Sequence, residues 1–355
     1  MSRLPDLVIG GLKIYPPIIQ GGMGLKISLA NLASAVATEG GVGTISAISG
    51  AFAHGPNDRA ILETLLREEI RKARRMTKGV LAVNILVALV NFENLVKIAV
   101  EEGIDIIFAG AGLPLSLPKL VEGSTTRICP IVSSGRTAEI LCKNWINKFH
   151  RAPDAVIVEG PMAGGHLGYS FEDLAQEPPV KKLEDILQEV LAVTRKYEAS
   201  AGVKIPVVAA GGIFDGKDIA RMLKLGASGV QMGTRFVATD ECDAALPFKQ
   251  AFVNAKKEDI TIIQSPVGMP GRALRNSFLD RSKLGQIKFN CSYQCLKTCN
   301  PSQSPYCIAE ALMNAAAGDL DNGFVFCGSN VYRVDKIVPV KTLMRELVTE
   351  AEQAY

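Results

Sequence analysis

The feature that most constrains the fold is a regular alternation of short apolar runs with segments of helical periodicity. Eight such runs occur before residue 237, and each is nearly free of charged residues. Continuous apolar runs indicate strands that are buried on both faces, which is typical of parallel strands covered by helices. We therefore predict an α/β protein, a (β/α)8 TIM barrel. The predicted strands are "PIIQ" from Pro17, 41–47, 80–87, 104–112, 127–134, 154–160, 205–213 and 229–236.

A doubly wound sheet is the alternative that this alternation also allows. Such sheets usually carry a dinucleotide-binding fingerprint of three spaced glycines after the first strand. The nearest match here, "GAGLPLS" at 110–116, lacks the third glycine, and Pro114 interrupts the helix that should follow. The barrel is therefore the favoured architecture.

The pattern changes after residue 236. The stretch "DITIIQSPVGMPGRALRNSF", 259–278, alternates strand-like residues with Gly and Pro, and "VKTLMRELVTEAEQA" near the end has helical periodicity. We predict a barrel over 1–236, a smaller α+β lid domain over 237–324, and a C-terminal segment over 325–355 that packs back on the barrel.

Composition excludes several classes of function. Hydrophobic residues make up 48% of the chain and charged residues 21%, so a sizeable core can form, and the net charge of +3 is too small for a typical nucleic-acid binder. No signal peptide and no apolar run long enough to span a membrane is visible, so we expect a cytoplasmic protein with a small-molecule substrate and no nucleic-acid or membrane partner. Whether it forms a homodimer stays open.

Glycine-rich strand ends predict a phosphate site. Gly211 and Gly212 end the seventh predicted strand, and Gly233 and Thr234 end the eighth. The loops after strands seven and eight are the usual phosphate site of TIM barrels, and glycines let backbone N–H groups approach phosphate oxygens. Tight turns without a ligand are the alternative.

Three further strand ends suggest what the phosphate belongs to. Gly22 and Met23 follow the first strand and offer a flat surface for a planar ring, and Asn84 places an amide in an otherwise apolar strand. A buried amide needs hydrogen-bond partners, which a ring edge or the protein itself could supply. His166 follows Gly164 and Gly165 after the sixth strand, where a neutral imidazole could exchange a proton with a ligand. An exposed loop histidine is the alternative.

The motifs "PIIQGGMG", "GAGLP", "EGPMAGGHLG", "VVAAGGI" and "GVQMGTRF" occur in this order over about residues 15–236. Together they resemble the nitronate monooxygenase (2-nitropropane dioxygenase-like) family of FMN enzymes, which is related to the flavin-dependent enoyl-ACP reductases. The resemblance implies a TIM barrel with FMN at its mouth, a smaller lid domain, and His166 as the catalytic base or proton donor. The FMN-binding residues that it implies, with the glycine loops above, are Gly22, Met23, Asn84, Glu159, Gly164, Gly165, Gly211, Gly212, Gln231, Met232, Gly233 and Thr234.

Two positions depart from the family pattern. Glu159 stands where nitronate-oxidising members usually have Gln, and the enoyl reductases also have Glu there. Met162 replaces an acidic residue that is common to both branches. We therefore expect an FMN-dependent oxidoreductase that oxidises nitronates or nitroalkanes, with an NAD(P)H-dependent enoyl-thioester reductase as the alternative. A flavin-free barrel for a sugar phosphate and a non-catalytic binding protein rank behind both. His54 and His150 fit turns and helix ends and are assigned no role.

Four of the eight cysteines cluster in "CSYQCLKTCNPSQSPYC", as Cys291, Cys295, Cys299 and Cys307. The first three could lie on one helical face, and disulfides are unusual in the cytosol. We expect these thiolates to hold an iron–sulfur cluster, with structural zinc or unliganded thiols as alternatives. A cluster near the flavin would allow single-electron transfer.

Overall fold

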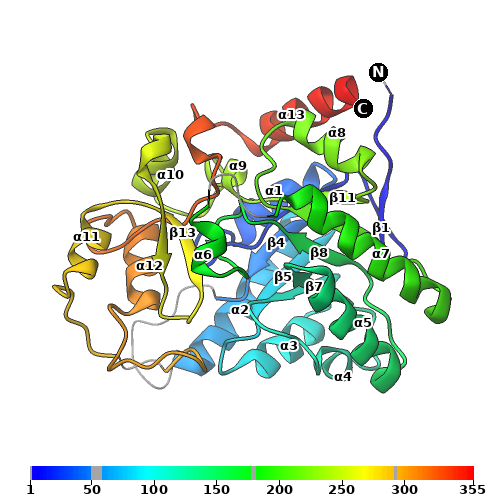
Figure 1. The fold of residues 1–355 in the computed structure, drawn as a ribbon, viewed down its shortest axis with the longest axis horizontal. Helices are drawn as coiled ribbons and strands as arrows, with labels where there is room; N and C mark the ends of the chain where they lie inside the picture. The colour runs from blue at the N-terminus through cyan, green and yellow to red at the C-terminus, as the bar shows by residue number, and fades with distance from the viewer. Residues whose placement is uncertain (1, 49–57, 177–180, 292–293) are drawn as a thin grey trace.

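The computed structural model describes residues 2–48, 58–176, 181–291 and 294–355. Its main sheet is parallel and eight-stranded, with the order β3-β11-β10-β8-β7-β6-β5-β4 (Figure 1). The edge strands β3 and β4 meet through a bridge between Ile19 and Val42, and the Val42 N–H donates to Ile18 O at 3.0 Å. Because the two edges meet, the sheet is a nearly closed barrel. The TIM-barrel prediction is confirmed, and the doubly wound alternative is wrong.

The eight barrel strands coincide with the eight apolar runs, and nearly all their residues are buried, as strands covered on both faces require. They are β3 (Ile18–Gln20), β4 (Gly43–Ser46), β5 (Leu81–Leu86), β6 (Ile106–Gly110), β7 (Arg127–Val132), β8 (Val156–Glu159), β10 (Val207–Ala210) and β11 (Gly229–Met232).

A short antiparallel hairpin closes the amino-terminal end of the barrel. It consists of β1 (Leu7–Ile9) and β2 (Leu12–Ile14), and its apolar side chains join the same buried cluster as Ile106 and Phe108 of the barrel. Arg127, the first residue of β7, donates a hydrogen bond to Gly10 O at 3.2 Å, which ties the hairpin to that end. The carboxyl ends of the strands are left as the face where a site can form.

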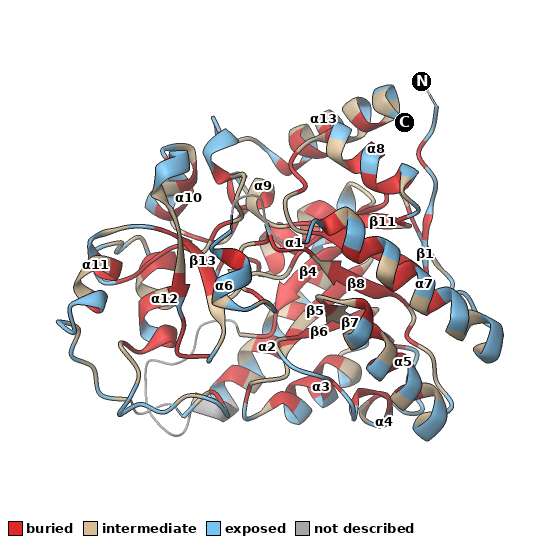
Figure 2. Cartoon of the chain, viewed as in Figure 1, coloured by how far each residue is buried: buried red, intermediate tan, exposed pale blue. Residues whose placement is uncertain are grey.

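Helices surround the barrel with their buried faces inward and their exposed faces outward (Figure 2). The approach is closest at Gly43, where an added Cβ would lie 1.8 Å from the carbonyl oxygen of Ala33, so α1 rests directly on β4. The C-terminal helix α13 packs against α8, and the Gly216 N–H donates to the Glu350 carboxylate at 3.0 Å. The surrounding helices are α1 (Ala30–Thr38), α2 (Asp58–Met76), α3 (Phe92–Glu101), α4 (Leu117–Leu120), α5 (Gly135–Phe149), α7 (Leu183–Ala201), α8 (Gly216–Lys224) and α13 (Val340–Ala354).

The segment after the barrel strands gathers beside the barrel, where Figure 1 places α11, α12 and β13 together. A hairpin of β12 (Ile260–Gln264) and β13 (Pro270–Leu274) is extended by β9 (Gly165–His166), a short strand from the barrel loop after β8. The remaining elements are α6 (Phe171–Leu174), α9 (Thr234–Val237), α10 (Leu246–Val253), α11 (Ser277–Lys283), α12 (Ile308–Ala316) and the 3₁₀ turns Lys257–Asp259 and Val331–Arg333. The division into domains at 236 and 324 stays a prediction. In the described part of the chain, no helix is long and apolar enough to span a membrane.

Arg272 links this hairpin to the barrel through side-chain hydrogen bonds. Its side chain is 7% exposed, and its guanidinium donates to the carbonyl oxygens of Pro161, at 2.7 Å, and of Ala163, both in the loop after β8. A planar guanidinium can serve two carbonyls at once, and neither carbonyl would otherwise be satisfied away from water.

We predict that Arg272→Met lowers the free energy of unfolding by about 2–4 kcal/mol, because it leaves buried carbonyl groups without donors. Arg275→Met is the matched control: Arg275 is exposed and its ion pair with Asp280 is on the surface, so its loss costs less than about 1 kcal/mol. Urea unfolding of both variants measures the difference. An equal decrease in the free energy of unfolding in both variants would mean that Arg272 does not stabilise the contact between the hairpin and the barrel.

Candidate active site

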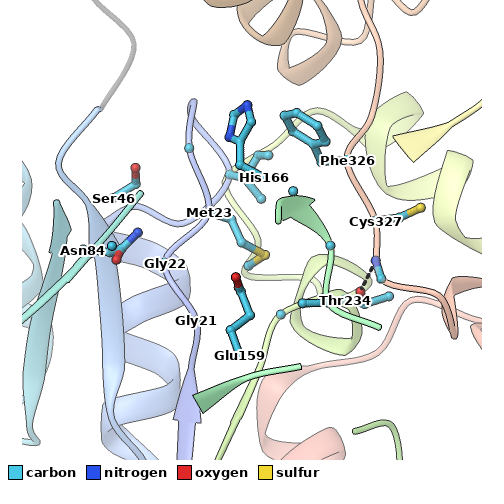
Figure 3. Close-up of a pocket in the computed structure, with 18 of the residues that line it drawn as sticks. Gly21, Gly22, Met23, Ser46, Asn84, Glu159, His166, Thr234, Phe326 and Cys327 are labelled. Atoms are coloured by element: carbon cyan, nitrogen blue, oxygen red, sulfur yellow. Dashed lines mark hydrogen bonds between the residues drawn. The ribbon is translucent and has the colours of Figure 1, made fainter. Parts of the chain in front are cut away.

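A cavity of about 300 Å³ lies at the carboxyl ends of the barrel strands (Figure 3). Its wall includes every residue that we predicted for the flavin site, together with His166. These residues come from loops far apart in the sequence, so their convergence follows from the barrel topology. Their roles as ligands remain predictions.

One end of the cavity is built from backbone and small side chains. Gly211 and Gly212 have φ of +95° and +81°, a conformation that favours glycine. The Thr234 hydroxyl accepts a hydrogen bond from the Gly328 N–H at 3.0 Å, and Asn330 donates to Gly212 O at 2.7 Å. Such a lining of N–H groups and hydroxyls suits a phosphate.

The contribution of the segment 326–330 was missed by sequence reasoning. Phe326, Cys327, Gly328, Ser329 and Asn330 all line the cavity, although the sequence placed them in a segment that only packs on the barrel. A cluster of Gly, Ser and Asn in "CGSN" was the available signal, because such residues often carry binding loops.

The floor of the cavity carries polar side chains from β5, β8 and β11. Among the described residues, no hydrogen-bond partner is recorded for the side chains of Asn84, Glu159 or Gln231, and all three face the cavity. Gly22 allows this arrangement, because an added Cβ there would lie 2.3 Å from Asn84 Cβ. Donors and acceptors without protein partners, beside a glycine surface and a phosphate-suited end, fit FMN.

Glu159 is the one carboxyl group among the described cavity residues. It is enclosed by protein except toward the cavity, and this burial raises the pKa of its carboxyl to about 8. At neutral pH the group is therefore mostly protonated and can donate as well as accept, like the amide of a glutamine. The Tyr169 hydroxyl holds the backbone here by donating to Glu159 O at 2.6 Å.

His166 stands above this floor on β9 (Figure 3). Its strand pairs with β13, its ring packs edge-on against Phe326 with centroids 4.9 Å apart, and its Nε2 lies 2.7 Å from the Ser265 hydroxyl. Burial lowers the pKa of the imidazole to about 4, so the ring is neutral at physiological pH. A neutral, oriented imidazole can accept or donate one proton.

Part of the cavity wall is apolar, and we call this part its apolar arm. In the described part of the chain, no lysine or arginine lines the cavity, so this arm suits an uncharged part of a substrate. The arm is lined by Leu25, Ile27, Leu89, Phe252, Val267, Leu296, Ile308, Ala309 and Leu312.

The prediction for the cysteine cluster is not supported. The segment around Cys291, Cys295 and Cys299 is not helical where the structure describes it: Gln294 has φ of +45°, and the neighbouring backbone pairs with the loop after β5 through Leu296 and Leu89. Within the described ranges, no group of three or more His, Cys, Asp or Glu residues that could hold a metal is found, so neither the expected iron–sulfur cluster nor the zinc alternative is supported.

Two of the four thiols are largely enclosed by protein and are influenced by the other cysteines of the segment. Burial, followed by the neighbouring thiols Cys307, Cys291 and Cys299, raises the pKa of Cys295 to about 12, and burial also raises the pKa of Cys307. Cys295 instead lines the apolar arm of the cavity, and Cys307 is buried at the start of α12. His150 is exposed at the end of α5, and His54 lies outside the described residues.

Comparison with known proteins decides the family. The model of the nitronate monooxygenase family matches residues 6–350. The chain belongs to the nitronate monooxygenase family. It is therefore an FMN-dependent oxidoreductase, and the enzyme class expected from the sequence is confirmed.

Three proteins illustrate what the chain is similar to. A probable nitronate monooxygenase of Staphylococcus saprophyticus is 27% identical over 314 residues, covering 79% of this chain and 81% of its own. The structure of FabK from Thermotoga maritima is 31% identical, covers 96% of this chain and 94% of that one, and has a TM-score of 0.72. A nitroalkane oxidase from Streptomyces ansochromogenes has a TM-score of 0.74 at 23% identity, covering 96% of this chain and 97% of that one, and shows the same fold.

The raised pKa of Glu159 predicts a pH-dependent stability for this family member. The unfolded carboxyl ionises near 4.5, whereas the folded one keeps its proton up to about 8. Between these values the unfolded state loses a proton that the folded state retains, so stability falls as the pH rises. Glu159→Gln should remove this loss and exceed the wild-type stability by about 1–3 kcal/mol at pH 9, with little difference at pH 4.

Thermal unfolding of the flavin-free proteins between pH 4 and 9 measures this effect. Glu172→Gln, at an exposed position on α6, is the control and should follow the wild type throughout. A constant offset between Glu159→Gln and wild type across the range would contradict the assigned protonation of Glu159.

Proposed function

We propose that this chain oxidises nitronates or nitroalkanes, with His166 as the residue that handles the proton of the substrate. The observation that carries the proposal is a neutral, buried imidazole on the wall of a flavin-suited cavity, in a member of the nitronate monooxygenase family. The nitronate monooxygenase of S. saprophyticus, similar over most of its length, supports this choice of substrate.

Different residues of the chain would bind different parts of the cofactor. Gly211, Gly212, Gly233 and Thr234 would hold the FMN phosphate, and Asn84, Glu159 and Gln231 would bind polar atoms of the cofactor. Bound FMN would supply the acceptor for the electrons of the substrate.

His166 would act on the substrate beside the cofactor. As a base, its neutral ring can remove the proton next to the nitro group of a nitroalkane. With a nitronate, which has already lost that proton, the ring can donate a hydrogen bond to the anionic oxygen and assist electron transfer. The surrounding apolar side chains exclude water and strengthen either interaction.

A second function is favoured by the apolar arm and by FabK, a flavin enoyl reductase. An enoyl-thioester reductase needs space for an acyl chain, and the apolar arm supplies apolar side chains that could contact one. Glu159 also matches the residue of the enoyl-reductase branch. In this alternative NAD(P)H would be the electron donor, and His166 would supply a proton to the substrate.

Anaerobic mixing of the flavin-loaded protein with substrates distinguishes the two functions. We expect a nitronate such as propyl-2-nitronate to bleach the flavin absorption in the stopped-flow, without any pyridine nucleotide. NADH and NADPH, mixed separately, should bleach it far more slowly. Rapid bleaching by a pyridine nucleotide with none by the nitronate would reject nitronate oxidation and favour the reductase.

His166→Ala should slow the reduction of the flavin by substrate about 10²–10⁴-fold, which is the usual contribution of a proton-transfer group. Flavin content, measured by absorption, should change little, because the cradle residues are untouched. His150→Asn is the control for removing a histidine, since His150 is exposed and outside the cavity wall. A wild-type reduction rate in His166→Ala would mean that His166 is structural.

A further inference from the structure

Ser265 is bound to the imidazole of His166 although 99 positions separate them in the chain. Its Oγ lies 2.7 Å from Nε2, and the residue is 2% exposed. Ser265 follows β12 directly and opens the turn to β13, which is closed by the hydrogen bond from its own N–H to Met269 O at 3.2 Å. The contact is therefore made by a turn and not by a free loop.

The partners of the Ser265 hydroxyl determine which atom donates. Its oxygen accepts a hydrogen bond from the Val267 N–H at 3.3 Å, and an amide can only donate. Among the described residues, His166 Nε2 is the one acceptor recorded for the hydroxyl proton. A proton on Nε2 would leave that hydroxyl hydrogen buried without an acceptor, which costs about 1–3 kcal/mol. The hydroxyl therefore donates to Nε2.

This direction sets the tautomer of the ring. A neutral imidazole carries one proton, and if Nε2 accepts from Ser265 the proton is on Nδ1. Free histidine in water prefers the opposite tautomer, so the serine has to hold the ring in this form. No protein partner is recorded for Nδ1 in the described part of the chain, so this N–H is left for a ligand of the cavity.

The geometry points to Ser265 as a positioning residue that holds His166 in its Nδ1–H tautomer, so that the ring meets the substrate as a hydrogen-bond donor. The inference rests on the proposed function for its consequence. A donor stabilises the anionic oxygen of a nitronate, whereas the α-proton of a neutral nitroalkane needs a ring nitrogen with a free lone pair. The enzyme should therefore favour the ionised substrate over its neutral parent.

The surrounding structure holds Ser265 and His166 in fixed relative positions. His166 is paired with Gly271 of β13, and Ser265 lies in the turn that joins β12 to β13 of the same three-stranded sheet. The Thr298 hydroxyl donates to Val267 O at 2.7 Å and supports the turn from the other side. The edge contact with Phe326 limits rotation of the ring. These contacts hold the hydrogen bond in one geometry.

The tautomer can be measured directly by ¹⁵N NMR of the flavin-loaded protein with labelled histidine, at pH 7. The chain has only three histidines, so the His166 signals can be assigned by their absence in His166→Ala. We expect the Nδ1–H coupling pattern in the wild type and a shift toward Nε2–H in Ser265→Ala. An Nε2–H pattern in the wild type, or an unchanged pattern in Ser265→Ala, would overturn the inference.

Kinetics separate positioning from a general structural effect. Ser265→Ala should lower kcat/KM for a nitronate about 10-fold, as expected for one lost hydrogen bond, without lowering it for the parent nitroalkane. Ser265→Thr keeps the hydroxyl and should recover most of the loss, and Ser302→Ala, at an exposed position, should have no effect. An equal decrease in kcat/KM for both substrates would mean that Ser265 does not act by positioning His166. If the wild type oxidises no nitronate, the proposed function fails, whereas the tautomer measurement still tests Ser265.

Discussion

The pairing of β13 with β9 is the interaction on which the site depends. It joins a hairpin from the segment after the barrel strands to a strand of only two residues that ends with His166. So short a strand cannot hold its own conformation; the neighbouring strand pairs with it, and the Arg272 side chain holds the loop before it by donating to the carbonyl oxygens of Pro161 and Ala163. The barrel thus provides most of the residues predicted to bind FMN, while the orientation of the histidine comes from the later segment.

The electrostatics of the cavity follow from the same enclosure. Burial raises the pKa of Glu159 to about 8 and lowers that of His166 to about 4, so that both groups are mainly uncharged at neutral pH. Burial thus shifts the two pKa values in opposite directions, and both shifts favour the neutral form. The cavity therefore binds through hydrogen bonds and dipoles rather than through the charges of these two groups. In such surroundings, the direction of a single hydrogen bond has a large effect on an anionic substrate.

The sequence was most informative where local pattern and topology agree. Continuous apolar runs predicted all eight barrel strands, and parallel strands bring their carboxyl ends together, so Gly22, Asn84, Glu159 and Gly212 could be assigned to one site before any coordinates. Phe326 and Ser265 could not be found in this way. Phe326 reaches the cavity, and Ser265 reaches His166, through long-range pairing of β12, β13 and the segment that follows α12, and no local period records that pairing.

The cysteine segment shows why periodicity alone can mislead. Spacing of four residues between Cys291, Cys295 and Cys299 fits a helical face, yet the backbone near Cys295 pairs with the loop after β5: the Val90 N–H donates to Cys295 O at 3.1 Å. Tertiary pairing outweighed the weak local preference of a short polar segment. The same pairing brings Leu296 and Cys295 to the apolar arm. If the barrel end binds FMN as proposed, the residues that select the substrate are to be sought in this segment and in the turn that carries Ser265.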